Sequence, residues 1–127
     1  MKHCGILVNA YVSRFVDVSI KRLERYVELG LWASNNNGTI VGSGGYGYTS
    51  SLDKAPSPNI RVGLDQLWGC GNAQIFSEVS PDMHWEFSLK HEMRWLKHFK
   101  LNYYGCCEQL HNKIDILSRI PGLRKIS

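Results

Sequence analysis

The stretch at residues 101–111, LNYYGCCEQLH, constrains the fold of this chain more than any other. An apolar and aromatic run ends in a glycine, and two adjacent cysteines, Cys106 and Cys107, follow at once, before Glu108 and His111. Such a run predicts a short buried strand that opens into a polar tip, and the residues after the tip predict a helix. In parallel α/β folds, ligands and chemistry collect at the carboxyl ends of strands. We therefore expect an α/β protein with reactive groups at this strand end.

Helices and strands alternate along the rest of the chain. Apolar residues at near-helical spacing predict a helix over residues 6–29, which Gly30 ends in a left-handed turn. Ser80, Pro81 and Asp82 suit a cap, a first helical position and the positive end of the dipole, so they predict a second helix that runs to about residue 99. The other predicted elements are strands at residues 31–34, 101–104 and 123–126 and a helix at residues 112–120.

This alternation predicts a parallel sheet with right-handed crossovers. Two or three parallel strands make a poor independent sheet, because parallel sheets need both faces covered. The predicted elements begin on a helix and end on a strand, so we expect residues 1–127 to be a single, incomplete segment of a partial (β/α) TIM barrel. Open sheet edges recruit other chains. We therefore expect either a homo-oligomer or a missing remainder of the barrel that covers these edges.

A long segment at residues 38–64 carries many glycines, two tyrosines and two prolines. One interpretation is a surface loop, and the other is a lid or binding loop, because structureless connections of this length are uncommon and usually functional or disordered. The second interpretation assigns substrate contacts to Asn36, Asn37 and Tyr46. Both predict that residues 42–58 are the most mobile internal stretch.

Charge and composition narrow the function classes. The 127 residues include 15 basic and 11 acidic residues, a mild net charge of +4, and the basic residues are scattered. No basic stripe interleaved with aromatic residues is present, so we expect no nucleic-acid partner. No apolar run is long enough to span a bilayer, so we expect no membrane segment. No small-residue cleavage site follows the short apolar patch at the N-terminus, so we expect a cytoplasmic location. Neighbouring cysteines form strained bridges, which favours reduced thiols.

The polar tip combines the residue types that zinc selects, namely thiolate, imidazole and carboxylate. Cys106 and Cys107 are the candidate metal ligands, although each cysteine also suits a small buried apolar position. A carboxylate at the end of a buried strand is costly unless it is paired or functional, so Glu108 is a candidate for proton transfer. His111 is the second such candidate, or else a residue that faces water at the start of a helix.

Three histidines, His84, His91 and His98, lie seven residues apart in the second predicted helix and hence near one face. They could form a metal-binding stripe, but ligands on a helix usually lie three or four residues apart. We therefore favour a solvated polar face for these histidines. We also favour a packing role for Cys70 over a role as a distant metal ligand.

Three segments carry a resemblance to a known family: NNNGTIVGSGGYGYT, DQLWGCGNAQIFSEVSPDMH and LNYYGCCEQLHNKIDILSRIPGLRKIS. They resemble a branch of the uroporphyrinogen decarboxylase superfamily, which includes cobalamin-dependent methyltransferases and whose members are TIM barrels. The resemblance covers most of the chain, chiefly residues 34–127. Because a whole barrel needs about 250 residues, the chain is similar to a middle-to-late portion of one.

The resemblance implies methyl transfer that involves a corrinoid or a thiol acceptor, with a decarboxylase acting on a carboxylated or tetrapyrrole substrate as the alternative. In the methyltransferases, zinc held by a His-x-Cys pair and a distant cysteine activates the thiol. Here Gly105, Cys106 and Cys107 occupy that strand tip, so the histidine is missing, and either cysteine can stand for the family's cysteine. The family's distant cysteine would lie beyond Ser127, and the arginine-rich motif of the decarboxylases is absent.

The resemblance further implies zinc as a cofactor and a corrinoid carried on a partner protein, in addition to a small-molecule substrate. The missing histidine, the missing distant cysteine and the missing arginine-rich motif predict that the segment alone is inactive. A third interpretation is a non-catalytic truncated chain that associates with itself or with a partner.

Overall fold

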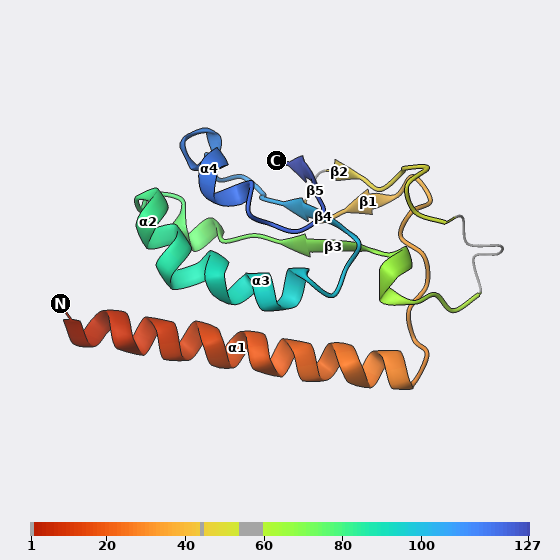
Figure 1. The fold of residues 1–127 in the computed structure, drawn as a ribbon, viewed down its shortest axis with the longest axis horizontal. Coiled ribbons are helices and arrows are strands. Elements are labelled where there is room, and N and C mark those ends of the chain that lie inside the picture. Colours follow the sequence, from red (N-terminus) through yellow and green to blue (C-terminus); the bar gives the residue numbers. More distant parts are fainter. Residues whose placement is uncertain (1, 44, 54–59) are drawn as a thin grey trace.

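The computed structural model describes residues 2–43, 45–53 and 60–127. The chain is a mixed α/β protein in which a long N-terminal helix precedes a small hairpin, and alternating strands and helices follow. In Figure 1 the long helix lies below a second helical layer, the parallel sheet lies above that layer, and the hairpin lies at the upper right. The parallel α/β prediction is confirmed, while the described strands form no closed barrel.

Helix α1 (Lys2–Glu28) confirms the first predicted helix and starts four residues earlier than predicted. It ends as expected, because Gly30 adopts a positive φ of 60° and its N–H donates to the Val27 carbonyl. Val16 and Leu23 are buried, whereas Phe15, part of the predicted apolar face, is mostly exposed. The helix therefore buries a narrower stripe than its sequence predicts. Within the described residues no helix is both long and apolar enough to cross a bilayer.

The second predicted helix is present as three consecutive pieces: α2 (Pro81–His84), a π-helical segment (Trp85–Leu89) and α3 (Lys90–Leu96). Its predicted start is confirmed, since the Ser80 hydroxyl accepts a hydrogen bond from the Met83 N–H at 3.3 Å and caps the helix. The π-helical segment has the i→i+5 bonding that adds a residue to the turn, and the sequence pattern did not predict it.

The main sheet has three parallel strands in the order β3 (Trp68–Gly71), β4 (Leu101–Tyr104) and β5 (Leu123–Ile126). The central strand β4 is buried at all four residues, which confirms the strand predicted at the tip. Strand β5 confirms the prediction for residues 123–126. The strand predicted at residues 31–34 is wrong: Leu31 is 59% exposed, and Ala33 forms an isolated antiparallel bridge with Arg61.

Strands β1 (Ile40–Val41) and β2 (Gly45–Tyr46) form an antiparallel hairpin inside the segment predicted as a long loop. The hairpin is folded closely against the sheet: a Cβ added to Gly42 would lie only 2.8 Å from the Tyr103 ring. The mobility predicted for residues 42–58 falls partly on residues 44 and 54–58, which lie outside the described residues.

The two faces of the sheet have separate cores. On the hairpin side, the buried apolar residues include Val41, Leu52, Trp68, Leu101 and Tyr103. On the helix side, the core is built from α2, the π-helical segment, α3 and α4 (Ile114–Leu117). Its buried members are Ala73, Leu89, Leu96, Tyr104, Leu110, Ile116, Leu117 and Ile120. Alternation along β4 therefore sends Tyr103 to the hairpin and Tyr104 to the helices.

The helix predicted at residues 112–120 is shorter than expected, because His111–Lys113 form a 3₁₀ turn before α4. Within the predicted helix, Ile116, Leu117 and Ile120 are buried, whereas Ile114 is 47% exposed.

Candidate functional site

The carboxyl ends of β3 and β4 lie side by side, since Gly71 pairs with Tyr104 and the Gly105 N–H donates to the Gly71 carbonyl at 3.0 Å. The predicted tip follows β4 directly. Cys106 is half-buried and Cys107 is exposed, with their sulfur atoms 3.6 Å apart. The two thiols therefore lie at the edge of the sheet where ligands collect in parallel folds.

Glu108 folds back beneath this tip and is 6% exposed. Its Oε2 accepts the Cys106 N–H at 2.8 Å, and its Oε1 accepts the Ala73 N–H at 3.4 Å. The carboxylate thus ties the loop after β4 to the loop after β3, and backbone amides compensate its burial. His111 is exposed at the start of its 3₁₀ turn. The proton-transfer roles of Glu108 and His111 stay predictions.

The tip does not assemble a complete zinc site. Among residues 4–43, 45–53 and 60–127, no three histidine, cysteine, aspartate or glutamate side chains are grouped so that they could hold a metal ion. Cys106 and Cys107 supply at most two sulfur ligands, and both oxygens of Glu108 accept backbone hydrogen bonds. The residues present therefore do not fit the four-coordinate zinc that the resemblance implies.

The three residues predicted to bind substrate lie on the hairpin side of the sheet. Asn36 is buried and structural: its Oδ1 accepts the Thr49 N–H at 2.9 Å and the Trp68 indole N–H at 3.1 Å. The Asn37 Oδ1 accepts the Thr39 N–H at 3.1 Å and stabilises a turn. Tyr46 is exposed at the hairpin. Asn36 therefore fixes the segment before the hairpin, and substrate binding by all three stays a prediction.

A pocket that the sequence did not predict lies between α1, α3 and the end of β3. It has a volume of about 490 Å³, and we call it the α1–β3 pocket. Its walls are mainly aromatic and aliphatic, with a few polar groups, the usual composition of a site for a small organic ligand. It is lined by Tyr11, Val12, Phe15, Val16, Ser19, Arg22, Cys70, Gly71, Asn72, Ala73, Ile75, Phe76, Ser88, Glu92 and Trp95.

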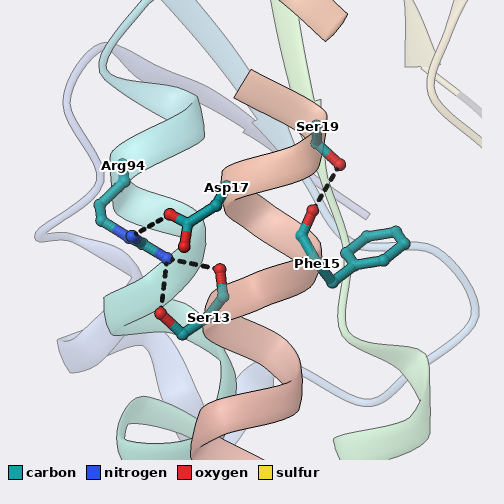
Figure 2. A network of polar contacts seen from close by, with 5 residues as sticks. All are labelled: Ser13, Phe15, Asp17, Ser19 and Arg94. Carbon is teal, nitrogen blue, oxygen red and sulfur yellow. Dashed lines mark hydrogen bonds and ion pairs between the residues drawn. The ribbon is translucent and has the colours of Figure 1, made fainter. Parts of the chain in front are cut away.

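Polar contacts hold α1 in place beside this pocket. Figure 2 shows Arg94 of α3 reaching Asp17, with an N–O distance of 2.6 Å, and donating to the carbonyl and hydroxyl of Ser13. In the same view, Phe15 and Ser19 project from the other side of α1. Because Phe15 and Ser19 line the pocket, this ion pair fixes the helix that forms one wall.

Glu92 is the acidic side chain of the pocket, and it belongs to a chain of hydrogen bonds. Its Oε2 accepts the Tyr104 hydroxyl at 2.6 Å and the Ser88 hydroxyl at 3.2 Å. The Tyr104 oxygen in turn lies 2.9 Å from Nε2 of His84. The Glu92 carboxyl group thus contacts Ser88 and Tyr104 directly, and His84 through Tyr104.

Burial perturbs the proton affinities of these groups. Desolvation raises the pKa of Glu92 to about 7, against the opposing effect of the hydrogen bonds from Tyr104 and Ser88. Burial, and to a lesser extent the charge of Lys113, lowers the pKa of His84 to about 4, so this imidazole is neutral at pH 7. Burial also raises the pKa of the Tyr104 phenol, so the phenol keeps its proton. Perturbed titrating groups of this kind in a pocket mark a candidate functional site.

The π-helical segment explains why the favoured interpretation of the histidines is wrong. His84 is fully buried instead of facing solvent, and so is Leu89, five residues later. The π-helical segment adds one residue between His84 and α3, which changes the register of His84 relative to His91 and His98. His91 is half-buried, and its Nε2 lies 2.8 Å from Oδ1 of Asn9. The three histidines therefore do not share a solvated face.

Cys70 is a packing residue on the hairpin side, as favoured. A Cβ on Gly42 would lie 2.6 Å from its sulfur atom. Burial raises the pKa of this thiol to about 11, so it stays protonated at neutral pH.

The Glu92 cluster could have been suspected from one pattern. His84, Ser88 and Glu92 recur every four residues beside the apolar stripe of the helix, the spacing of one helical face. Comparisons of this chain with protein-family models, with curated proteins and with solved structures found no match.

Proposed function

We propose that the α1–β3 pocket binds a small carboxylated organic molecule and that Glu92 transfers a proton to it. The observation that carries the proposal is the position of Glu92. Its carboxyl group lines an apolar pocket at the carboxyl end of a parallel strand, and burial raises its pKa to about 7. A carboxylic acid with a pKa near the working pH is suited to general acid catalysis.

Decarboxylation is the reaction that this arrangement supports best. The bond between the substrate carbon and its carboxylate breaks, carbon dioxide leaves, and the electron pair stays on the carbon. Glu92 gives its proton to that carbon and becomes a carboxylate, which water then protonates again. Arg22 lines the same pocket and is suited to hold the substrate carboxylate. The pocket volume is typical for a drug-sized ligand.

In this proposal the three parallel strands are part of a (β/α) barrel in a cytoplasmic enzyme. Support comes from strands β3, β4 and β5, which run parallel and are joined by helical connections. The pocket lies beside the carboxyl end of β3, where barrel enzymes bind substrates. The chemistry assigned to Glu92 needs no metal, and a corrinoid partner belongs to the second candidate function below.

Binding and carbon dioxide release test the proposal together. The panel contains aromatic carboxylates, a carboxylated tetrapyrrole and the matching uncharged alcohols. We expect the wild-type chain to bind carboxylates more tightly at pH 6 than at pH 8, because neutral Glu92 donates a hydrogen bond and ionised Glu92 repels them. We expect Glu92→Gln to lose this pH dependence and to reduce any carbon dioxide release by about 10²-fold or more.

Glu28→Gln is the matched control, because Glu28 is an exposed glutamate that pairs with Arg25 and does not line the pocket. It should behave like the wild type. Equal binding of carboxylates and alcohols, with the same pH profile in Glu92→Gln, would contradict the proposal.

Methyl transfer at the tip is the second candidate, favoured by the two thiols at the end of the central strand, one of them exposed. The hydrogen bond with Cys106 raises the pKa of the Cys107 thiol, so it is a weak nucleophile without an activating group. Methylation of Cys106 or Cys107 by a methylcorrinoid, detected by mass spectrometry, would favour this function over proton transfer.

A further inference from the structure

The two oxygens of Glu92 differ in the hydrogen bonds that they accept. This difference allows an inference about the position of the Glu92 proton, and that inference rests on the proposed function. Oε2 accepts both the Tyr104 and the Ser88 hydroxyls. No hydrogen bond to Oε1 is present among the described residues, and Oε1 is not one of their buried unpaired atoms. Oε1 is therefore the oxygen that remains accessible, and the pocket is the space that Glu92 lines.

The proton count of the chain follows from Tyr104, which has one hydroxyl proton. If that proton is donated to Glu92, the Tyr104 oxygen must accept from the Nε2–H of His84. His84 then carries a bare lone pair on Nδ1, and this atom is buried without a partner among the described residues. A bare acceptor in this place is less costly than an orphaned N–H donor, which is rarer in protein interiors.

The opposite arrangement is less favourable. A proton on Oε2 could be donated to Tyr104, whose hydroxyl would then turn to His84 and force a proton onto the unpartnered Nδ1. It could instead be donated to the Ser88 oxygen at 3.2 Å, and the Ser88 hydroxyl would then no longer donate to Glu92. The Ser88 hydroxyl would also lose its better acceptor, because a carbonyl oxygen accepts hydrogen bonds better than a protonated one.

We propose that Tyr104 and His84 are positioning residues that keep the exchangeable proton of Glu92 on Oε1, toward the pocket. The network serves the ionised and the protonated carboxyl group without rearrangement, since Oε2 accepts the same two hydroxyls in both states. Proton transfer to a bound molecule therefore needs no movement of the core. Tyr104 and His84 themselves stay neutral throughout.

Other titratable groups surround this carboxyl group. Glu108 adds a like charge that raises the pKa of Glu92, and the charge of Glu92 contributes, after burial, to the raised pKa of the Cys70 thiol on the hairpin side. Lys113 acts on His84 from the side of α4, where its ammonium group donates to the Phe76 and Ser77 carbonyls. Arg22 lines the same pocket from α1. These groups are unchanged in the variants below, so differences between the variants report on the hydroxyl donors.

Infrared difference spectroscopy of the unliganded chain tests the inference. Lowering the pH through 7 should produce a carboxylic acid carbonyl band, which Glu92→Gln removes and thereby assigns. With the proton on Oε1, the carbonyl is Oε2, which accepts two hydrogen bonds and absorbs at low frequency. Tyr104→Phe should move the band to higher frequency and raise its pH midpoint by about one unit.

Ser88→Ala should produce a smaller change in the same direction, and it decides the question if Tyr104→Phe fails to fold. Tyr103→Phe is the matched control, because this buried neighbour in β4 faces the hairpin. It should leave the band unchanged. A band and a midpoint that are the same in wild type, Tyr104→Phe and Ser88→Ala would overturn the inference. The proposed function fails by a different readout, the binding of carboxylates.

Discussion

Two glutamates within the same small domain show how surroundings set the role of a carboxyl group. Glu108 accepts two backbone N–H groups and joins two loops. Glu92 accepts two hydroxyls at one oxygen and leaves the other open beside an apolar pocket. Amide donors stabilise a buried negative charge, whereas apolar surroundings oppose it. The first glutamate is therefore suited to structure and the second to proton transfer.

The raised pKa of Glu92 predicts an unusual dependence of stability on pH. The folded pKa of about 7 lies above 4.5, the ordinary pKa of a glutamate in an unfolded chain. Folded Glu92 therefore holds its proton in a pH range in which the unfolded group has lost it, and stability falls as the pH rises from 4.5 to 7. His84 acts in the opposite direction, because its folded pKa of about 4 lies below the unfolded 6.5 and stability is lost as the pH falls through that range.

We expect Glu92→Gln to remove the first dependence and to leave the second. Relative to wild type, the variant should gain about 2 kcal/mol in free energy of unfolding between pH 4.5 and 7, allowing for the partial exposure of Glu92 to the pocket. Urea denaturation at several pH values measures the difference. A difference between variant and wild type that is constant with pH would contradict the raised pKa.

The sequence predicts those parts of the site that lie close together in the chain, and it does not predict those that distant contacts bring together. Cys106, Cys107 and Glu108 are neighbours in the chain, so a strand followed by a polar run was enough to place them at a strand end. The Glu92 cluster joins residues 84, 88, 92 and 104 through the packing of helix on sheet. No local pattern links Tyr104 to residues 84, 88 and 92, because these contacts form only when β4 packs against the helix.

At the scale of elements, β4, β5 and the helix start at Ser80 followed from apolar runs and capping residues, whereas β3 did not. Strand β3 reads WGCG, and glycine is uncommon in strand interiors. The glycines are needed for packing: a Cβ on Gly69 would lie 2.5 Å from the Phe99 ring, and one on Gly71 would lie 3.2 Å from Tyr104. Because Phe99 and Tyr104 pack so closely on β3, the strand has glycines where β-branched or aromatic side chains would have indicated a strand.

Gly122, between α4 and β5, gives a prediction at this scale. It has a φ of 63°, and a Cβ there would collide with the backbone carbonyl oxygen of Lys100. Gly38 has a φ of 85°, with no atom within 4 Å of its Cβ position. We expect Gly122→Ala to lower the free energy of unfolding by about 3 kcal/mol, and Gly38→Ala, the matched control, by about 1 kcal/mol. Urea denaturation measures both losses. Similar losses in the two variants would show that the positive φ alone sets the loss of stability and that the collision with Lys100 adds nothing.

At the scale of the molecule, a row of large apolar side chains on α1 is exposed. Leu7 is 70% exposed, Tyr11 72% and Phe15 63%, and their four-residue spacing places them on one face. Strands β3 and β5 each have one partner among the described strands, so each presents an unpaired edge. Exposed apolar patches and open edges favour association, and the net charge of +4 opposes it only weakly.

We therefore expect the isolated chain to self-associate in sedimentation experiments over a range of concentrations. Leu7→Glu should weaken the association about tenfold, because it places a charge in the apolar row. Ile40→Glu, at an equally exposed position on the hairpin, is the control and should have little effect. A compact monomer at every concentration would contradict the expectation and would show that the domain covers its own core.

The attachment of α1 also has a consequence for the order of folding. The hydrogen bonds that hold α1 to the helical stretch at residues 81–96 join residues 77 to 82 positions apart and are partly exposed: Asp17 with Arg94, and Asn9 with Glu86 and His91. Among the described residues of α1, Val16 and Leu23 are the buried apolar side chains. Closing so long a loop costs entropy that only completed packing repays. The helix should therefore dock after the sheet and its covering helices have formed, and it should be the first element to detach. The wall of the pocket would then open and close in local unfolding events, while the strands behind it stay paired.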